Sequence, residues 1–342
     1  MAYSTINKHT DYFNTKLYTG NGGTQSLTGV GFQPDFTWIK SRSLNEHHNL
    51  YDAVRGVTKP LYTNLNYGEG SVSDSLTAFG TDGFSIGANA YINSNSATFA
   101  SWNWKANGAG SANTDGTINS TVSVNTTAGF SIVKYTGTGS AGSVGHGLSV
   151  KPDLIISKAY SASGDWNVYH NSFSAQQRIK LNSASNTSSN SSIFASLPTN
   201  QVVNIGTGGD INTSGTSHLF YCFASKTGYS KFGSYAPSPS GGNPFIYTGF
   251  KPSFLIIKGT VDSRNWILFD NKREDNEINN AIKPNANNAE FTESGLGVDI
   301  LSNGFKIRGA SGQINTTDGV KYLYIAFGQT IVGSNNVPAT AR

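Results

Sequence analysis

The sequence has few charged residues and a single cysteine. Charged side chains make up 13% of the 342 residues, well below the roughly 25% that is usual for soluble domains. Cys222 lies in an apolar run, so we expect a buried free thiol and neither a disulfide framework nor a cysteine metal site. The net charge is only +4, with Lys and Arg scattered along the chain. A nucleic-acid groove shows a basic stripe, so we expect no nucleic-acid partner.

Long apolar and helical patterns are also missing. No segment approaches the roughly 18 consecutive apolar residues of a membrane-spanning helix, and residues 1–10 lack the basic and apolar regions of a secretion signal. We therefore expect no membrane partner and synthesis in a cytoplasm. Amphipathic helical periodicity, heptads and Gly-X-Y repeats are not found either, so we expect few helices and no fibre shaft.

The sequence does contain one pattern three times. Gly31 to Lys40, Val150 to Lys158 and Gly249 to Lys258 each hold a proline, an apolar run, and a lysine six residues after the proline (34 to 40, 152 to 158, 252 to 258). An aromatic residue follows 17 residues after each proline, at Tyr51, Tyr169 and Phe269. Self-similarity at fixed spacing indicates one structural unit used three times.

The far end of the pattern is repeated as well. The pairs Ile92-Asn93, Ile211-Asn212 and Ile314-Asn315 each precede an aromatic residue by ten positions, at Trp102, Tyr221 and Tyr324. Short alternating runs such as Phe13 to Tyr18 are typical of half-buried strands, and the 39 glycines suit the turns between them.

These patterns predict an all-β protein of three tandem homologous antiparallel β-sandwich units, lectin/glucanase-like or jelly-roll-like. We place an N-terminal arm at 1–10, unit 1 at 11–106, a linker at 107–128, unit 2 at 129–226, unit 3 at 227–330 and a C-terminal tail at 331–342. The alternation at 121–124 lets the linker add one strand to a neighbouring sheet.

The repeated residues have a structural interpretation. The prolines begin strands, the aromatic residues fill cores, and Lys40, Lys158 and Lys258 mark strand ends where the ammonium reaches water over an apolar stem. The alternative is a triplicated binding site in which each lysine acts with Asp52, His170 or Asp270. The change from Asp to His at one of the three positions counts against a shared anion or metal chemistry.

No catalytic, cofactor or metal site emerges from the residues, and we expect no enzymatic activity. Carboxylates are sparse, and Asp35 and Asp153 are matched by Ser253 in the third copy; a carboxylate pair formed only in three dimensions remains open. Glu46-His47-His48 resembles a metal cluster, but neighbouring side chains on an extended loop point in opposite directions, so we expect a solvated loop. His48 also falls opposite Trp166 and Trp266 in the repeat, which favours a packing position. The mixed charges from Asp270 to Glu277 predict another solvated loop, with calcium binding as a minor alternative.

The repeated motifs resemble a poorly characterised repeat family found in virion proteins of tailed bacteriophages, often marine ones. The resemblance covers about residues 11–330. Its motifs are the runs 18–22, 29–40 and 101–105 of the first copy, supported by 145–148, 165–170 and 229–235. It implies a β-sandwich fold and a place on the particle surface, and it supplies no catalytic residues.

We therefore expect a non-enzymatic virion surface protein, in a tail fibre or other receptor-binding appendage, that contacts host surface glycan. The alternatives are a capsid-decorating or head-fibre protein and a surface-polysaccharide depolymerase. The expected partners are other virion proteins and a host glycan, and a homotrimer is the favoured oligomer. Loops rich in amides, hydroxyls and aromatic rings suit sugars and protein interfaces equally well.

Loop residues that differ between the copies are free to specialise, which gives the candidate ligand residues. They lie in the segments after each lysine: Asn45, Glu46, His47, Tyr160, Asp165, Asp262 and Arg264.

Overall fold

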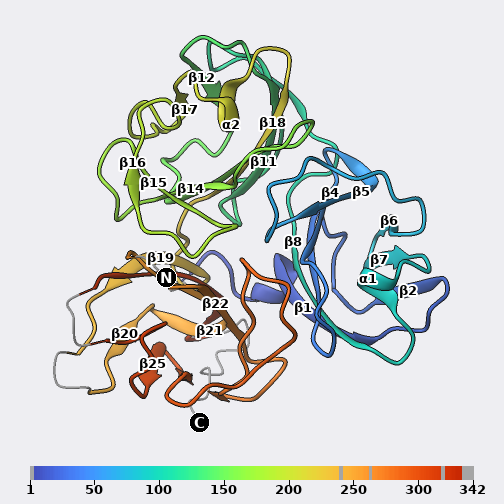
Figure 1. The fold of residues 1–342 in the computed structure, drawn as a ribbon, viewed down its shortest axis with the longest axis vertical. Coiled ribbons are helices and arrows are strands. Elements are labelled where there is room, and N and C mark those ends of the chain that lie inside the picture. The colour runs from blue at the N-terminus through green and yellow to red at the C-terminus, as the bar shows by residue number, and fades with distance from the viewer. Residues whose placement is uncertain (1–3, 239–241, 262–263, 317–319, 333–342) are drawn as a thin grey trace.

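The computed structural model describes residues 4–238, 242–261, 264–316 and 320–332, and Figure 1 shows them as three lobes around a common centre. We call residues 4–106 the first segment, 107–225 the second and 226–332 the third. The described part of the chain is nearly all β, in several antiparallel sheets. The prediction of an all-β fold is confirmed.

Each segment contributes one large sheet with the same central strand order. The first sheet is β1 (Phe13–Thr19), β8 (Thr98–Trp104), β3 (Phe36–Ser41), β4 (Asn49–Asp52) and β5 (Gly56–Tyr62). The second is β16 (Ser188–Ser189), β15 (Gln177–Lys180), β14 (Asn167–His170), β13 (Leu154–Ala159), β18 (Ser217–Phe223), β11 (Phe130–Thr136), β10 (Ser120–Asn125) and β9 (Ser111–Asn113). The third is β19 (Ser230–Tyr235), β26 (Tyr322–Thr330), β21 (Phe250–Gly259) and β22 (Trp266–Asp270). In all three, the last long strand lies between the first strand and the strand that carries the repeated proline motif.

A smaller sheet packs on each large one. These sheets are β2 (Gln25–Thr28), β7 (Gly83–Ile86) and β6 (Leu76–Gly80); then β12 (Gly142–Gly145) and β17 (Val202–Ile205); then β20 (Phe245–Tyr247), β25 (Gly304–Arg308), β24 (Gly297–Leu301) and β23 (Glu277–Ile278). A hydrophobic cluster fills the space between the two layers of each segment. In each segment a large and a smaller antiparallel sheet thus face each other across an apolar layer.

Helices are short and few within the described residues. They are η1 (His9–Asp11), α1 (Ala90–Asn93) and α2 (Gly209–Asn212). No helix of the described chain is long and apolar enough to cross a membrane. The predicted linker, 107–128, forms both β9 and β10 at the edge of the second large sheet, so it adds two strands there rather than one. Of the predicted C-terminal tail, 333–342 lie outside the described residues.

A fourth hydrophobic cluster joins the three segments at the centre. The strands with the proline motif are buried on both faces, which explains why their sequences are apolar runs rather than alternating ones. Trp104, Phe223 and Phe327, one from each segment, form a triangle with ring centroids 6.4, 5.7 and 5.5 Å apart. Such pairs stabilise by about 0.5–1.5 kcal/mol each beyond the area they bury.

Strand pairing corrects one predicted match. Trp102 pairs with Trp38 and Tyr221 with Ile156, but the matching partner of Ile256 is Ile325. Tyr324 is one residue out of register, so it lies in the apolar cluster between the two sheets of the third segment, while Ile325 lies in the central cluster.

The two repeated ends of each segment meet in one buried contact. The hydroxyl of Tyr18 donates to the carbonyl of Ile92 at 2.7 Å, and the Asn93 side chain accepts from the Asn21 backbone N–H at 2.9 Å. The Tyr135 and Tyr235 hydroxyls donate in the same way to the carbonyls of Ile211 and Ile314. The matching backbone N–H groups, of Thr138 and Ser238, donate to the side chains of Asn212 and Asn315. A Cβ on Gly20 would lie 2.2 Å from the Ser94 carbonyl oxygen, so only glycine fits at that turn.

Candidate functional site

The three repeated lysines shape the loops that carry the predicted ligand residues. We expected their ammonium groups to reach water, and this is wrong, because all three residues are 0% exposed. The Lys158 ammonium donates to the carbonyls of Ala159, Gly164 and Asn66 at 2.7, 2.9 and 3.2 Å. These acceptors match the three N–H donors of an ammonium group.

Lys40 and Lys258 hold their own loops in the same manner. Lys40 donates to Ser41 and Leu44, and Lys258 donates to Arg264 and Ser185. Burial lowers the pKa of Lys40 and of Lys158 to about 8, so both are charged at pH 7. A lysine therefore fixes the course of the chain between the proline strand and the next strand in each segment.

An asparagine then anchors the end of each loop. Asn64 accepts from the His48 backbone N–H at 3.1 Å, and its amide nitrogen contacts the His47 ring at 2.8 Å. Asn182 makes the same two contacts with Trp166 and Asp165 (3.1 and 2.9 Å), and Asn285 makes them with Trp266 and Asn265 (2.9 and 2.9 Å). One constant side chain thus positions a residue that differs in each segment: His47, Asp165 or Asn265.

We call the groups around these anchors loop sites 1, 2 and 3. Each site also includes a residue at the end of the second strand after the loop, or just after the corresponding bridge, namely Tyr62, Lys180 or Lys283. Its last member comes from the short helix or turn before the last long strand: Tyr91, Asp210 or Gln313. Loop site 1 is His47, Tyr62, Asn64 and Tyr91; loop site 2 is Asp165, Lys180, Asn182 and Asp210; loop site 3 is Asn265, Lys283, Asn285 and Gln313.

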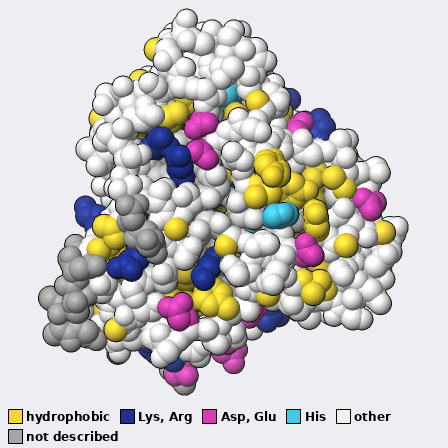
Figure 2. Space-filling view, viewed as in Figure 1, with side chains coloured by type: hydrophobic (Ala, Val, Ile, Leu, Met, Phe, Trp, Pro, Cys, Tyr) yellow, Lys and Arg dark blue, Asp and Glu magenta, His cyan; other side chains and the backbone are white. Residues whose placement is uncertain are grey.

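Loop site 1 is aromatic. The rings of His47, Tyr62 and Tyr91 lie 5.4, 5.9 and 6.3 Å apart between centroids, and Tyr91 is 39% exposed. Burial raises the pKa of Tyr62, and the nearby Tyr91 hydroxyl raises it further by a smaller amount. The Tyr62 phenol therefore stays neutral at pH 7. Figure 2 shows hydrophobic side chains gathered around a histidine on the lobe of the first segment. The site presents ring faces and amide groups together.

Loop site 2 is ionic. The Lys180 ammonium lies 2.5 Å from the Asp165 carboxylate, and the Asp165 backbone N–H donates to Asp210 at 3.1 Å. Burial raises the pKa of Asp165, but bonds from Asn182 and Lys180 more than offset this and hold the pKa below its usual value. Asp165 is thus held as the ion-pair partner of Lys180.

Loop site 3 is built from amides. The Gln313 side chain accepts from the Asn265 backbone N–H at 2.7 Å, and the Asn285 amide donates to the Asn265 side chain at 2.9 Å. The Lys283 ammonium lies 4.4 Å from the centre of the Phe291 ring. One scaffold therefore displays aromatic, ionic and amide chemistry at three matched places.

The structure brings only some of the predicted residues to these sites. His47 and Asp165 belong to loop sites 1 and 2. Asn45 instead accepts from the Ala289 backbone N–H of the third segment, and the Tyr160 carbonyl accepts from Glu69 of the first. Glu46 is half-buried near Lys40, the Arg264 side chain lies against Gly259 and Gly312, and Asp262 lies outside the described residues.

Sequence reasoning missed the anchors and the distant members of each site. A usable signal existed for the anchors, because Asn64 and Asn182 both lie 30 residues after their prolines (34 to 64, 152 to 182). The third lies 33 residues after its proline (252 to 285), so a comparison without gaps does not find it.

His48 lies in the interior of the protein, where the first and third segments meet. It is buried, accepts from the Trp38 indole at 3.0 Å and contacts the Lys283 carbonyl, which confirms a packing position. Among the described residues, no group of three or more His, Cys, Asp and Glu side chains could hold a metal ion.

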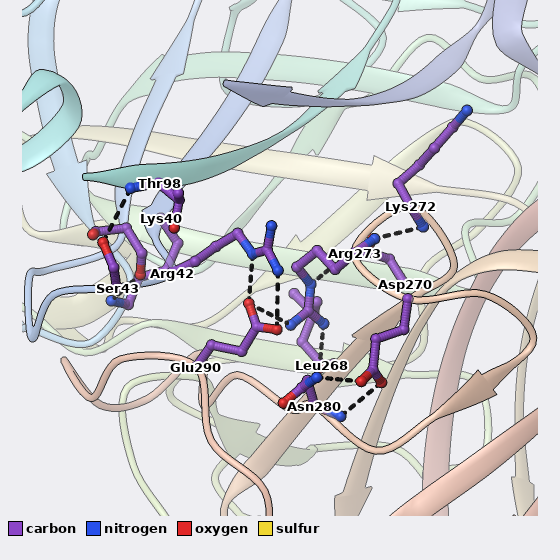
Figure 3. Close-up of polar contacts among 12 residues, drawn as sticks. Lys40, Arg42, Ser43, Thr98, Leu268, Asp270, Lys272, Arg273, Asn280 and Glu290 are labelled. Atoms are coloured by element: carbon purple, nitrogen blue, oxygen red, sulfur yellow. Dashed lines mark hydrogen bonds and ion pairs between the residues drawn. The ribbon is translucent and has the colours of Figure 1, made fainter. Parts of the chain in front are cut away.

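Asp52 and Asp270 are buried ion-pair residues. Asp270 bonds Arg273 and the Trp102 indole, and Asp52 bonds Arg55 and the Tyr221 hydroxyl. In the second segment, His170 and Phe173 stand at the positions of the aspartate and the arginine. The third segment has Ile325 at the position of the donor residues Trp102 and Tyr221. All three members of the buried cluster thus change together, which accounts for the exchange of Asp for His. Figure 3 shows Arg273 and Arg42 both reaching Glu290 at the joint of the first and third segments.

Comparison with known proteins gives one family match. A family model described as a domain of unknown function (DUF7483) matches residues 8–330. No curated protein matches the chain, and no solved structure does.

Proposed function

The chain belongs to the DUF7483 family, and we propose that it is a non-enzymatic surface protein of a tailed-bacteriophage virion that contacts host surface glycan. The single observation that carries the glycan contact is loop site 1, where two tyrosine rings and a histidine ring lie beside an asparagine. Ring faces stack on the apolar faces of sugars, and amides bond their hydroxyls. The virion assignment rests on the sequence resemblance, and we propose a tail fibre or other receptor-binding appendage as the location.

We infer that the three segments are copies of one β-sandwich closed into a ring. The backbone N–H of Glu69 donates to Tyr160, that of Thr187 to Thr260, and that of Glu290 to Arg42, at 2.7, 3.1 and 2.9 Å. Each bond joins one segment to the next, and the third returns to the first. An interface that repeats head to tail and closes is the mark of a cyclic assembly.

The ring of three segments is relevant to the predicted homotrimer, because both have three-fold geometry. A cyclic arrangement within one chain already supplies three-fold geometry, and a homotrimer of such rings would present nine loop sites, three of each kind. Light scattering on the purified chain measures this directly, with a mass three times 36.3 kDa expected. A monomer mass at micromolar concentration would remove the homotrimer from the proposal.

Glycan contact is tested by binding to host cells and to their isolated surface polysaccharide. The variant Tyr91→Ala should weaken binding by at least about tenfold, or about 1.4 kcal/mol, because a stacking face is lost. Tyr67→Ala is the matched control, since Tyr67 is 58% exposed and lies outside the ring cluster. Equal binding of the wild type and Tyr91→Ala would exclude loop site 1 as the contact.

The ring also favours a second candidate, a capsid-decorating or head-fibre protein. A three-fold ring of similar units suits a three-fold position on a capsid lattice. Locating the protein in a map of the whole particle separates the two, since a decorating protein occupies many lattice positions and its deletion leaves adsorption unchanged.

A depolymerase is the third candidate, favoured only by the neighbouring carboxylates of Asp165 and Asp210. Incubation with host polysaccharide, followed by a measurement of chain length, decides the matter, and we expect unchanged length.

A further inference from the structure

Two segments hold a buried or half-buried carboxylate just after the repeated proline. Asp35 accepts from the backbone N–H groups of Ala106 and Gly108 at 2.7 and 3.1 Å. Asp153 accepts from the Ser225 backbone N–H at 2.7 Å and from the Asn171 amide at 2.9 Å. In both segments, this carboxylate fastens the chain as it leaves the last long strand.

The third segment has Ser253 at this position. Its hydroxyl donates to the Phe327 carbonyl at 3.3 Å, and β26 continues in the sheet to Thr330, with an irregularity in its pairing between Pro252 and Phe254. A cavity of about 190 Å³ lies here instead, lined by His9, Thr10, Lys251, Ser253, Asn271, Lys272 and Gln329. At about 30 Å³ per water molecule, this is room for about six waters or one small organic anion.

Among the described residues, the lining carries positive charge and no carboxylate. Lys251 and Lys272 are its cations, and Figure 3 shows the Lys272 side chain running away from Arg273. His9 is neutral at pH 7, because burial, assisted by Lys272, lowers its pKa to about 4. Two acids that act on the lining residues lie outside the lining: Asp275 acts on Lys251, and Asp11, which acts on His9, pairs with Lys8 at 2.7 Å.

Asn271 completes the comparison between segments. It occupies the position of Asn171, whose side-chain amide donates to the Asp153 carboxylate. The backbone N–H of Asn271 donates to the Ser253 carbonyl, just as the backbone N–H of Asn171 donates to the Asp153 carbonyl. The same backbone contact therefore positions the Asn271 amide in the third segment, but this amide lies next to a serine instead of a carboxylate.

We propose that this cavity binds a small oxyanion, with Asn271, Lys251 and Lys272 as its contacts. The carboxylate of a sugar acid and a phosphate group share the required chemistry, since both offer charged oxygens to amide and ammonium donors. The site is separate from the loop sites and does not depend on the proposed glycan contact.

The test is titration calorimetry on the full chain at low ionic strength and pH 7, with glucuronate and inorganic phosphate as probes. We expect saturable binding of one anion per chain. Tighter binding of glucuronate assigns a sugar-acid site, and equal or tighter binding of phosphate assigns a phosphate site. Saturable binding of neither probe would overturn the proposal.

Variants locate the site. Ser253→Asp introduces the carboxylate that the other segments carry and should weaken binding at least tenfold, while its unfolding midpoint reports whether it folds. Lys272→Gln alters an exposed side chain without affecting folding and should weaken binding about fivefold or more. Lys151→Gln is the matched control, because Lys151 precedes Pro152 as Lys251 precedes Pro252. Binding that persists in both Ser253→Asp and Lys272→Gln, or that is lost in Lys151→Gln, would refute this location.

Discussion

The buried ion pair of Asp270 and Arg273 offers the sharpest test of how the segments are joined. Asp270 accepts from the Arg273 guanidinium at 2.6 Å, from the Arg273 backbone N–H at 3.0 Å and from the Trp102 indole of the first segment at 3.1 Å. Both charged side chains are 0% exposed. The variant Asp270→Ala removes the closest acceptor of a buried cation, which keeps only the longer contact with Glu290 at 3.4 Å and a bond to the Leu268 carbonyl, and leaves the buried Trp102 indole N–H without its acceptor.

We expect Asp270→Ala to lower the free energy of unfolding by about 3–5 kcal/mol, the usual cost of removing one partner from a buried pair. Lys8→Ala is the control, because Lys8 and Asp11 form an ion pair of the same sequence spacing with side chains that are 64% and 49% exposed. Exposed pairs contribute about 0–1 kcal/mol, so this variant should be close to the wild type.

A double variant separates charge burial from packing. Asp270→His combined with Arg273→Phe introduces the residues found at 170 and 173 and removes both buried charges. Because no uncompensated charge remains, we expect it to be more stable than Asp270→Ala alone.

Urea unfolding followed by tryptophan fluorescence and by circular dichroism measures the effect, and coincident curves justify a two-state free energy. A loss below about 1 kcal/mol for Asp270→Ala, or a double variant less stable than the single one, would refute the reasoning.

Three further predictions concern buried polar groups. Stability should fall between pH 6.5 and 4: burial lowers the pKa of His170 to about 4, so the unfolded chain binds its proton first. Because burial also lowers the pKa values of four other histidines, His9, His48, His146 and His218, His170→Gln should remove part of the fall of the urea midpoint with pH; an unchanged dependence would contradict the role of His170. Lys158→Met leaves the lysine's carbonyl acceptors without that donor and should cost about 1–3 kcal/mol, with faster hydrogen exchange after residue 158; unchanged exchange would contradict its role in the loop. Tyr18→Phe, Tyr135→Phe and Tyr235→Phe each remove one buried bond of 2.6–2.7 Å, and thermal unfolding should show three similar losses of about 1 kcal/mol; losses that differ by more than about 1 kcal/mol would argue against matched environments.

The sequence by itself determined the β character and the repeated positions. Strand alternation, proline at strand starts and glycine in turns act over a few neighbouring residues, so they can be read directly. The prediction that Tyr51, Tyr169 and Phe269 fill cores is confirmed, since each lies in the apolar cluster between the two sheets of its segment. The match of Tyr324 was wrong by one residue, because a gap count does not reveal an extra residue between the last turn and the strand.

Only the tertiary structure decided that the repeated lysines are buried and which residues make up the loop sites. Two of the three carbonyl acceptors of Lys158 are local, but the third comes from Asn66, 92 residues away, and no local pattern records such a partner. His47 was predicted as a ligand residue, but Tyr62 and Tyr91 reach it from a following strand and a short helix. Periodicity fixes which face of a strand a side chain occupies; which distant side chains share that face depends on how the sheets pack.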